Sequence, residues 1–108
     1  MRSVAAASLA LAAAACASAP RPLTEAELLV YPEARGMPAD VQDFIVRWTA
    51  CSHWSGEPGW DEARQRQIER AVAEACPGID ERGRRVRARH AGNAEVIARI
   101  AELGPLEQ

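Results

Sequence analysis

Apolar residues recur at every third or fourth position downstream of Pro38, which is the period of one buried face of an α-helix. The positions are Val41, Phe44, Ile45, Trp48 and Cys51. Pro38 suits a first helical turn, because its fixed φ is already helical and the N–H that it lacks would be unpaired there. The pattern predicts a helix over about 38–52 and then a turn over 53–59, where glycine and proline are frequent.

A second helical pattern covers residues 60–76 and ends at Pro77 and Gly78. Its acidic first turn suits the positive end of the helix dipole. The positions predicted to face inward are Ile68, Ala71, Val72, Ala75 and Cys76. Farther along, Asp80 is predicted to cap a third helix that runs to about His90.

Two shorter segments complete the helical pattern. Thr24 and Glu27 have the spacing of a capping box, which predicts a short helix near residues 24–29. Asn93 is predicted to cap a helix over 94–103, whose apolar stripe is Val96, Ile97, Ile100 and Leu103. No stretch alternates between apolar and polar residues as a strand would. The sequence therefore predicts an all-α domain over 24–108, a small bundle of three to four short helices.

The first residues have the pattern of an export signal. Arg2 is followed by an apolar run from Val4 to Ala15 that only Ser8 interrupts. A charged start, a short apolar stretch and small residues before a cleavage point are typical of a secretory signal peptide, here residues 1–15. The run is too short for a membrane-spanning helix, which needs about 20 apolar residues.

A cysteine follows these small residues directly, as in the lipobox of bacterial lipoproteins. Cys16 would then carry the lipid at the start of a tether over 16–23. The lipobox usually has Leu three residues before the cysteine, where this chain has Ala13. Ordinary signal peptidase could cut after Ala17 or Ala19 instead, so simple secretion remains the alternative. An uncharged residue after the lipidated cysteine favours the outer membrane over the inner one.

The charge balance excludes one class of partner. The 13 basic residues, all of them arginine, stand against 15 acidic ones, and the formal net charge is −2. A mildly acidic chain is a poor general ligand for nucleic acid, because neutralisation of phosphates supplies most of that affinity. We expect instead a protein of the bacterial cell envelope, periplasmic and held to the membrane by lipid on Cys16.

Two cysteines remain when Cys16 is acylated. Cys51 and Cys76 form an even pair, and thiols of exported proteins oxidise. A disulfide between them closes a loop of about 26 residues, which chain entropy makes worth roughly 3.5 kcal/mol. Both cysteines stand near the ends of consecutive predicted helices. The loop between the helices must therefore carry the chain back, or the helices must cross steeply.

The densest cluster of chemically versatile residues lies between these cysteines. It contains His53, Trp54, Glu57 and Trp60. In a purely structural interpretation, His53 and Trp54 pack over the disulfide, and Glu57 either holds His53 or caps the next helix. Alternatively, the two tryptophans present indole faces from a loop to a protein or a sugar, since indoles are frequent interface anchors.

Two other interpretations of the same segment are weaker. Cys51, His53, Cys76 and His90 offer zinc ligands, but their spacing matches no familiar zinc motif. Cys51 could act as a nucleophile with His53 or His90 as its base, but a disulfide would consume the thiol. We expect no catalytic residue, no metal site and no cofactor.

Arginines crowd the third predicted helix. They are Arg82, Arg84, Arg85, Arg87 and Arg89, followed by His90. A solvated helix with ion pairs to Asp80, Glu81 or Glu95 is the default expectation. The functional alternative is contact with anionic lipid headgroups or with cell-wall polymers.

The stretch from Val41 to Ala101 resembles a group of small exported proteins of Gram-negative bacteria. The shared pattern is a Cys-x-His-Trp-x-Gly-Glu segment after an apolar helix, with a second cysteine about 25 residues on. Here these residues are Cys51, His53, Trp54, Gly56, Glu57 and Cys76, and a last segment begins near Asn93. The resemblance implies an envelope location and a helical domain with paired cysteines. It supplies no catalytic residues.

Together these features predict a non-enzymatic interaction module, either lipid-anchored or secreted. Its partner would be an envelope protein or a cell-wall polymer. The alternatives are a small metal- or ligand-binding periplasmic protein that uses His53 and Cys51, or an inhibitor of an envelope hydrolase such as lysozyme.

Overall fold

The computed structural model describes Ser3 and residues 19–105. These residues form helices and connecting segments and contain no strand, which confirms the all-α class. The elements are α1 (Glu25–Val30), the 3-10 helix η1 (Pro32–Ala34), α2 (Ala39–Ser55), α3 (Glu62–Ala75), α4 (Ile79–Arg89) and α5 (Ala94–Leu103). The predicted signal peptide over 1–15 and the predicted lipid site at Cys16 lie outside the described residues. Of the helices in the described part, none has the length and apolar character needed to cross a membrane.

Side-chain caps fix two helix starts where the sequence predicts them. The hydroxyl of Thr24 accepts a hydrogen bond from the Glu27 N–H, and the Glu27 carboxylate accepts one from the Thr24 N–H. Asn93 accepts from the Val96 N–H at the start of α5. These bonds satisfy N–H groups that have no partner within the first helical turn.

Two predicted boundaries are wrong. Asp80 does not cap α4, because the helix begins one residue earlier at Ile79 and its N-cap is Gly78. Gly78 has a φ of 71°, a left-handed conformation that glycine adopts at little cost, so a tight turn separates α3 from α4 at that residue. The end of α2 also differs. The helix continues to Ser55 and includes His53 and Trp54, which the sequence placed in a turn.

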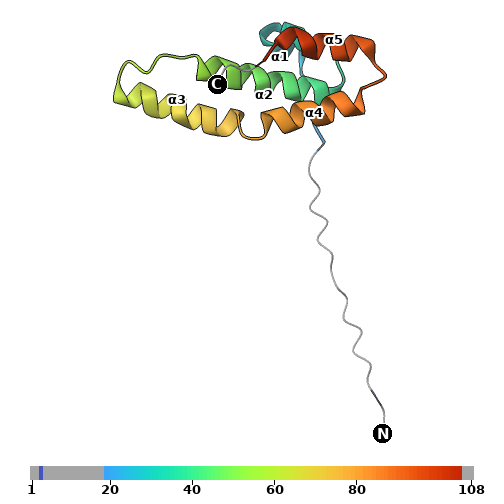
Figure 1. The fold of residues 1–108 in the computed structure, drawn as a ribbon, viewed down its shortest axis with the longest axis horizontal. Coiled ribbons are helices and arrows are strands. Elements are labelled where there is room, and N and C mark those ends of the chain that lie inside the picture. The colour runs from blue at the N-terminus through green and yellow to red at the C-terminus, as the bar shows by residue number, and fades with distance from the viewer. Residues whose placement is uncertain (1–2, 4–18, 106–108) are drawn as a thin grey trace.

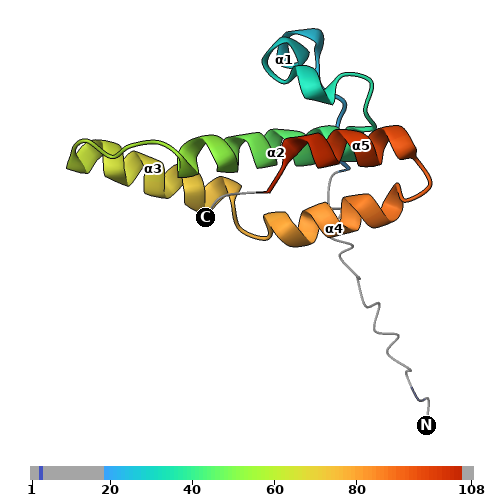
Figure 2. The same cartoon turned by 45° about the horizontal axis from the view of Figure 1, so that its top comes forward.

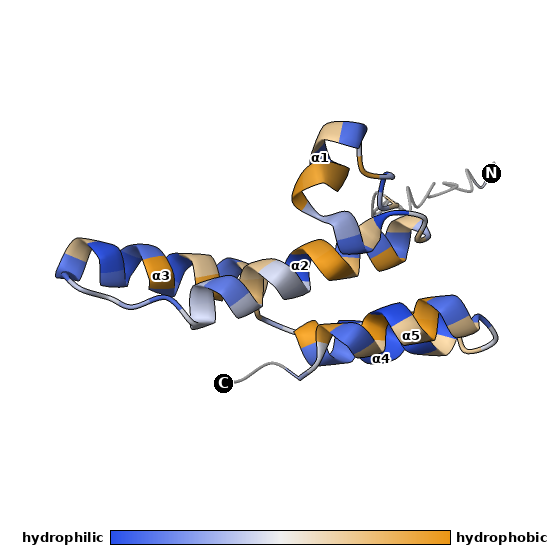
Figure 3. Ribbon diagram, turned by 90° about the horizontal axis from the view of Figure 1, so that it is seen from above, coloured by the Kyte–Doolittle hydropathy of each residue, from blue (hydrophilic) through white to orange (hydrophobic). Residues whose placement is uncertain are grey.

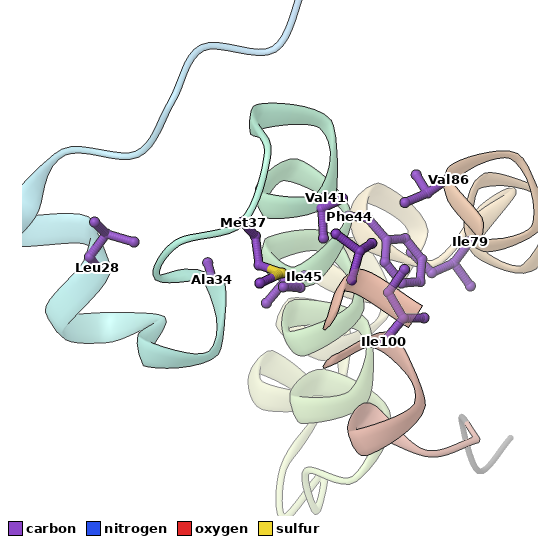
Figure 4. Packing of buried hydrophobic residues seen from close by; sticks show 10 residues of the cluster. Leu28, Ala34, Met37, Val41, Phe44, Ile45, Ile79, Val86 and Ile100 are labelled. Carbon is purple, nitrogen blue, oxygen red and sulfur yellow. The ribbon is translucent and has the colours of Figure 1, made fainter. Parts of the chain in front are cut away.

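The main core lies between α2 and its neighbours at one end of the molecule. Figure 4 shows Ile79 of α4 and Ile100 of α5 beside the ring of Phe44 of α2. The buried cluster comprises Leu28, Ala34, Met37, Val41, Phe44, Ile45, Ile79, Val86, Val96 and Ile100. These residues come from α1, η1, α2, α4, α5 and the segment before α2. Figure 2 shows α1 set to one side of α2, away from α3.

A buried glycine lets α4 approach this core closely. A Cβ atom on Gly83 would meet two atoms of the Phe44 ring at 3.1 and 3.2 Å. Contacts this short are tighter than side chains normally tolerate in a packed interior. Gly83 is therefore where the α4 backbone and the Phe44 ring pack against each other.

Helix α3 belongs to a separate arm, which we define as residues 56–75. In Figure 1 the loop after α2 runs outward, and α3 then returns beside it. The C-terminal end of α3 thus meets the C-terminal end of α2, although the two helices run in opposite directions. The loop carries the chain back, as one of the two predicted routes requires.

The predicted disulfide closes this arm at its base. Cys51 and Cys76 are bonded, with their Cα atoms 4.9 Å apart. No residue of α3 belongs to the main buried cluster, and Ile68 is its one buried side chain. The predicted inward residues Ala71, Val72 and Ala75 are only half-buried. Figure 3 shows α3 as largely hydrophilic along its length.

A candidate binding site on the arm

The residues of the predicted cluster come from both sides of the outward loop. His53 and Trp54 occupy the last turn of α2, so Trp54 does not stand in a loop. Glu57 and Trp60 lie in the loop itself. The side chain of Asp61, the N-cap of α3, accepts a hydrogen bond from the Arg64 N–H at 2.7 Å. This cap places the Arg64 side chain one turn into α3, beside the loop.

Arg64 connects the two tryptophans. Its Cζ atom lies 5.1 Å from the ring centroid of Trp54 and 4.8 Å from that of Trp60. A guanidinium over an indole face is attracted by the ring quadrupole, by about 0.5–1 kcal/mol at exposed sites and more where water is excluded. The two indoles are therefore joined through one cation.

Glu57 holds that cation and reaches a histidine as well. Its Oε2 accepts a hydrogen bond from Arg64 Nη2 at 2.8 Å, and its Oε1 lies 3.5 Å from Nε2 of His53. The His53 ring stands edge-on to Trp54, with 5.2 Å between the ring centroids. Of the two structural roles predicted for Glu57, the contact with His53 is observed, whereas Asp61 supplies the cap of α3.

The two tryptophans differ in exposure. Trp60 is 70% exposed, whereas Trp54 is half-buried. The Arg64 side chain is 19% exposed, and its Nε atom is buried without a partner among the described residues. The site thus presents one exposed indole, that of Trp60, which packs against the Arg64 guanidinium, and Arg64 is held by the Glu57 carboxylate. Such a surface suits apolar or planar groups of a partner.

Arg64 was not singled out from the sequence, although a signal was present. It follows Trp60 by four residues, the spacing at which helical side chains meet. Trp60 was considered as an aromatic residue of a loop, so its spacing to a residue of the following helix carried no weight.

The structure does not gather the four residues considered as zinc ligands into one site. Both sulfur atoms are bonded to each other, so neither is available as a thiolate. His90 lies elsewhere, with its Nε2 2.9 and 3.0 Å from the carboxylate oxygens of Asp40. Within residues 19–105, no group of three or more potential metal-ligating side chains gathers.

Asp40 anchors a second charged cluster near the start of α2. Its Oδ2 accepts a hydrogen bond from Arg89 Nε at 3.0 Å, in addition to the contacts with His90. Partial burial of the Asp40 carboxyl opposes its ionisation. The hydrogen bonds from His90, Arg89 and the Val41 N–H, together with the positive charge of His90, outweigh that effect, and the pKa of Asp40 lies below its ordinary value.

The arginines of α4 pair with Glu81, one of the three carboxylates expected, and with two carboxylates of α2. Arg84 and Arg85 contact Glu81, at 2.6 and 3.5 Å. Arg82 contacts Asp43 of α2 at 3.2 Å, and Arg89 contacts Asp40. Among the described residues, neither Asp80 nor Glu95 forms an ion pair with these arginines. The cross-helix pairs arise because α4 packs along α2, which no spacing within α4 could reveal.

The comparisons with known proteins leave the family open. No family model matches this chain, and neither a curated protein nor a solved structure shows significant similarity to it.

Proposed function

We propose that this protein is an exported, lipid-anchored and non-enzymatic interaction module of the bacterial cell envelope. The lipid is attached to Cys16 after removal of residues 1–15, and the module faces the periplasm, at the outer membrane in preference to the inner. The arm binds the partner, an envelope protein or a cell-wall polymer, with Trp60 as the central contact.

The observation that carries this proposal is the arm itself. Its helix adds nothing to the main core, yet the arm is held in place by a disulfide and by the contacts of Arg64 with Glu57 and both tryptophans. A rigid element that exposes a large indole fits a binding role better than a role in core stability. Tryptophans in such positions often dominate interface energies.

Two further features support the compartment. The disulfide suits an oxidising environment, in which such bonds persist. The apolar run before Cys16 has the composition of a signal peptide.

In vivo cross-linking tests the binding surface. Cells that express wild-type protein, Trp60→Ala or Leu29→Ala are treated with a cross-linker, and the products are identified by mass spectrometry. Leu29 is a matched control because it is also exposed, at 80%, but lies on α1 away from the arm. We expect Trp60→Ala to reduce the specific cross-linked product about tenfold or more, as loss of a hot-spot residue would. An equal yield from all three proteins would contradict the proposed surface.

Metabolic labelling with a fatty-acid analogue tests the anchor. We expect label on the wild-type protein and none on Cys16→Ser. An unlabelled mature chain that begins after Ala17 or Ala19 would mean simple secretion instead.

A further inference from the structure

A groove lined by arginines runs between α2 and α4. Its lining includes Arg47, Arg82, Arg85, Arg89, Asp43 and Pro20, and its volume is about 410 Å³. The three arginines of α4 stand three and four positions apart, so they form one stripe along the helix. Arg87 lies on a different face, where it lines a cleft with Phe44.

The groove keeps a small excess of positive charge, because its four arginines are paired with only three carboxylates. Outside the lining, Glu81 contacts Arg85 and Asp40 contacts Arg89. Asp43 is the one acidic residue among its lining residues, and it is shared between Arg47 at 3.3 Å and Arg82 at 3.2 Å. The side chains of the four arginines are between 43% and 67% exposed. Anions can therefore reach them, although the whole chain has a net charge of −2.

The N-terminal segment is fixed beside this groove. Arg21 donates hydrogen bonds to both carboxylate oxygens of Glu27, at 2.6 and 2.9 Å. The Leu23 N–H donates to Oε1 of Gln42 at 2.9 Å. Pro20 itself lines the groove together with residues of α2 and α4. These contacts hold Pro20 at the edge of the groove.

The short chain between Cys16 and Pro20 limits how far the groove can lie from the membrane. Cys16 precedes Pro20 by four positions, and an extended chain spans at most about 3.6 Å per residue. The Cα atom of Cys16, the residue that bears the lipid, therefore lies within roughly 14 Å of that of Pro20, whatever path the chain takes. Fields of exposed charges extend about 8 Å at physiological salt, so the arginines can reach the headgroup region.

We propose that the arginine groove binds the phosphate groups of anionic phospholipids in the membrane that holds the lipid of Cys16. This inference rests on the proposed anchoring. Anchoring confines the arginines to the membrane surface, and each arginine there adds about fivefold in affinity. The groove thereby fixes which face of the domain lies against the bilayer.

Vesicle sedimentation tests the groove without the anchor. The mature chain, residues 16–108 with Cys16→Ser, is mixed with vesicles of phosphatidylglycerol and phosphatidylcholine, or of phosphatidylcholine alone. We expect binding to the anionic vesicles that weakens as salt is raised. The substitutions Arg82→Gln, Arg85→Gln and Arg89→Gln together should weaken it at least tenfold.

A matched variant separates the groove from net charge. Arg35→Gln, Arg66→Gln and Arg70→Gln remove the same charge from other faces and should retain binding within about threefold. Arg85→Glu, at an exposed position, should weaken binding even if the triple variant is unstable. Replacing the three groove arginines by lysine should preserve most of it. Equal losses in both triple variants, or equal binding to uncharged vesicles, would overturn the inference, as would full displacement by millimolar inorganic phosphate.

The outcome is separable from that of the anchoring proposal. If Cys16 is labelled by fatty acid but the groove variants bind like wild type, the groove assignment alone fails. If Cys16 is unlabelled while binding still depends on the groove arginines, the anchor alone fails.

Discussion

At the scale of single residues, Gly83 and the Phe44 ring pack directly against each other in the core. A Cβ at position 83 would stand 3.1 Å from the Phe44 ring. Glycine in the middle of a helix costs about 1 kcal/mol relative to alanine, so this position trades helix stability for close approach.

A double-mutant cycle tests that trade. Gly83→Ala in the wild-type background should gain little or lose stability, because the clash offsets the helix gain. In a Phe44→Leu background, which removes the ring, the same substitution should stabilise by about 1 kcal/mol. Urea unfolding followed by circular dichroism measures both. Equal effects in the two backgrounds would show that the ring and position 83 do not interact.

The charged cluster around Asp40 makes stability depend on pH. Because the pKa of Asp40 is lower in the folded protein than its ordinary value of 3.8, its ionised form stabilises the fold above that value. The contribution is lost as the pH falls from about 3.8 through the lower folded-state pKa.

Asp40→Asn tests this dependence. We expect a loss of about 1–2 kcal/mol at neutral pH, the worth of hydrogen bonds to a charged group. The difference from wild type should shrink as the pH falls below 3.8. Thermal melts across this range measure it, with Glu62→Gln as a control because that side chain is 96% exposed. A difference that does not change with pH would mean that Asp40 acts through packing alone.

At the scale of elements, the disulfide fixes the arm to α2, whereas α3 contributes no residue to the main core. Reduction removes a constraint worth roughly 3.5 kcal/mol by chain entropy, and its effect should be local. The main cluster has no member in α3, so it has little to lose directly.

Hydrogen exchange of the Cys51→Ser, Cys76→Ser double variant tests this locality. Amides of α3 should exchange at least tenfold faster, while those of α2, α4 and α5 around Phe44 should remain protected. Uniform loss of protection would show that the arm and the core unfold as one unit.

Much of this element structure could be predicted from the sequence, because apolar spacing and caps are local signals. The apolar stripe from Val41 to Cys51 predicted α2, and Asn93 predicted the start of α5. The end of α2 was missed because nothing before Gly56 forbids a helix. The path of the arm could not be predicted, since a loop of given length allows several routes.

At the scale of the whole molecule, charge and apolar surface are unevenly distributed. The arginine groove combines Arg47 with residues of α4 that follow it by 35 or more positions. The crowding of arginines in α4 is evident from the sequence, but it does not show which of them pack against α2. Four residues of the candidate site, His53, Trp54, Glu57 and Trp60, were predicted from the sequence. Arg64 was not, because it belongs to a different helix from Trp54.

The unequal exposure of the indoles gives the protein an optical reporter of its own arm. Trp48 and Trp54 are partly covered, whereas Trp60 stands mostly in water. A soluble quencher such as acrylamide should therefore reach Trp60 first and preferentially quench its red-shifted emission. A ligand bound to the arm would shield the Trp60 indole from the quencher and shift its emission to the blue, so fluorescence can follow binding without any label.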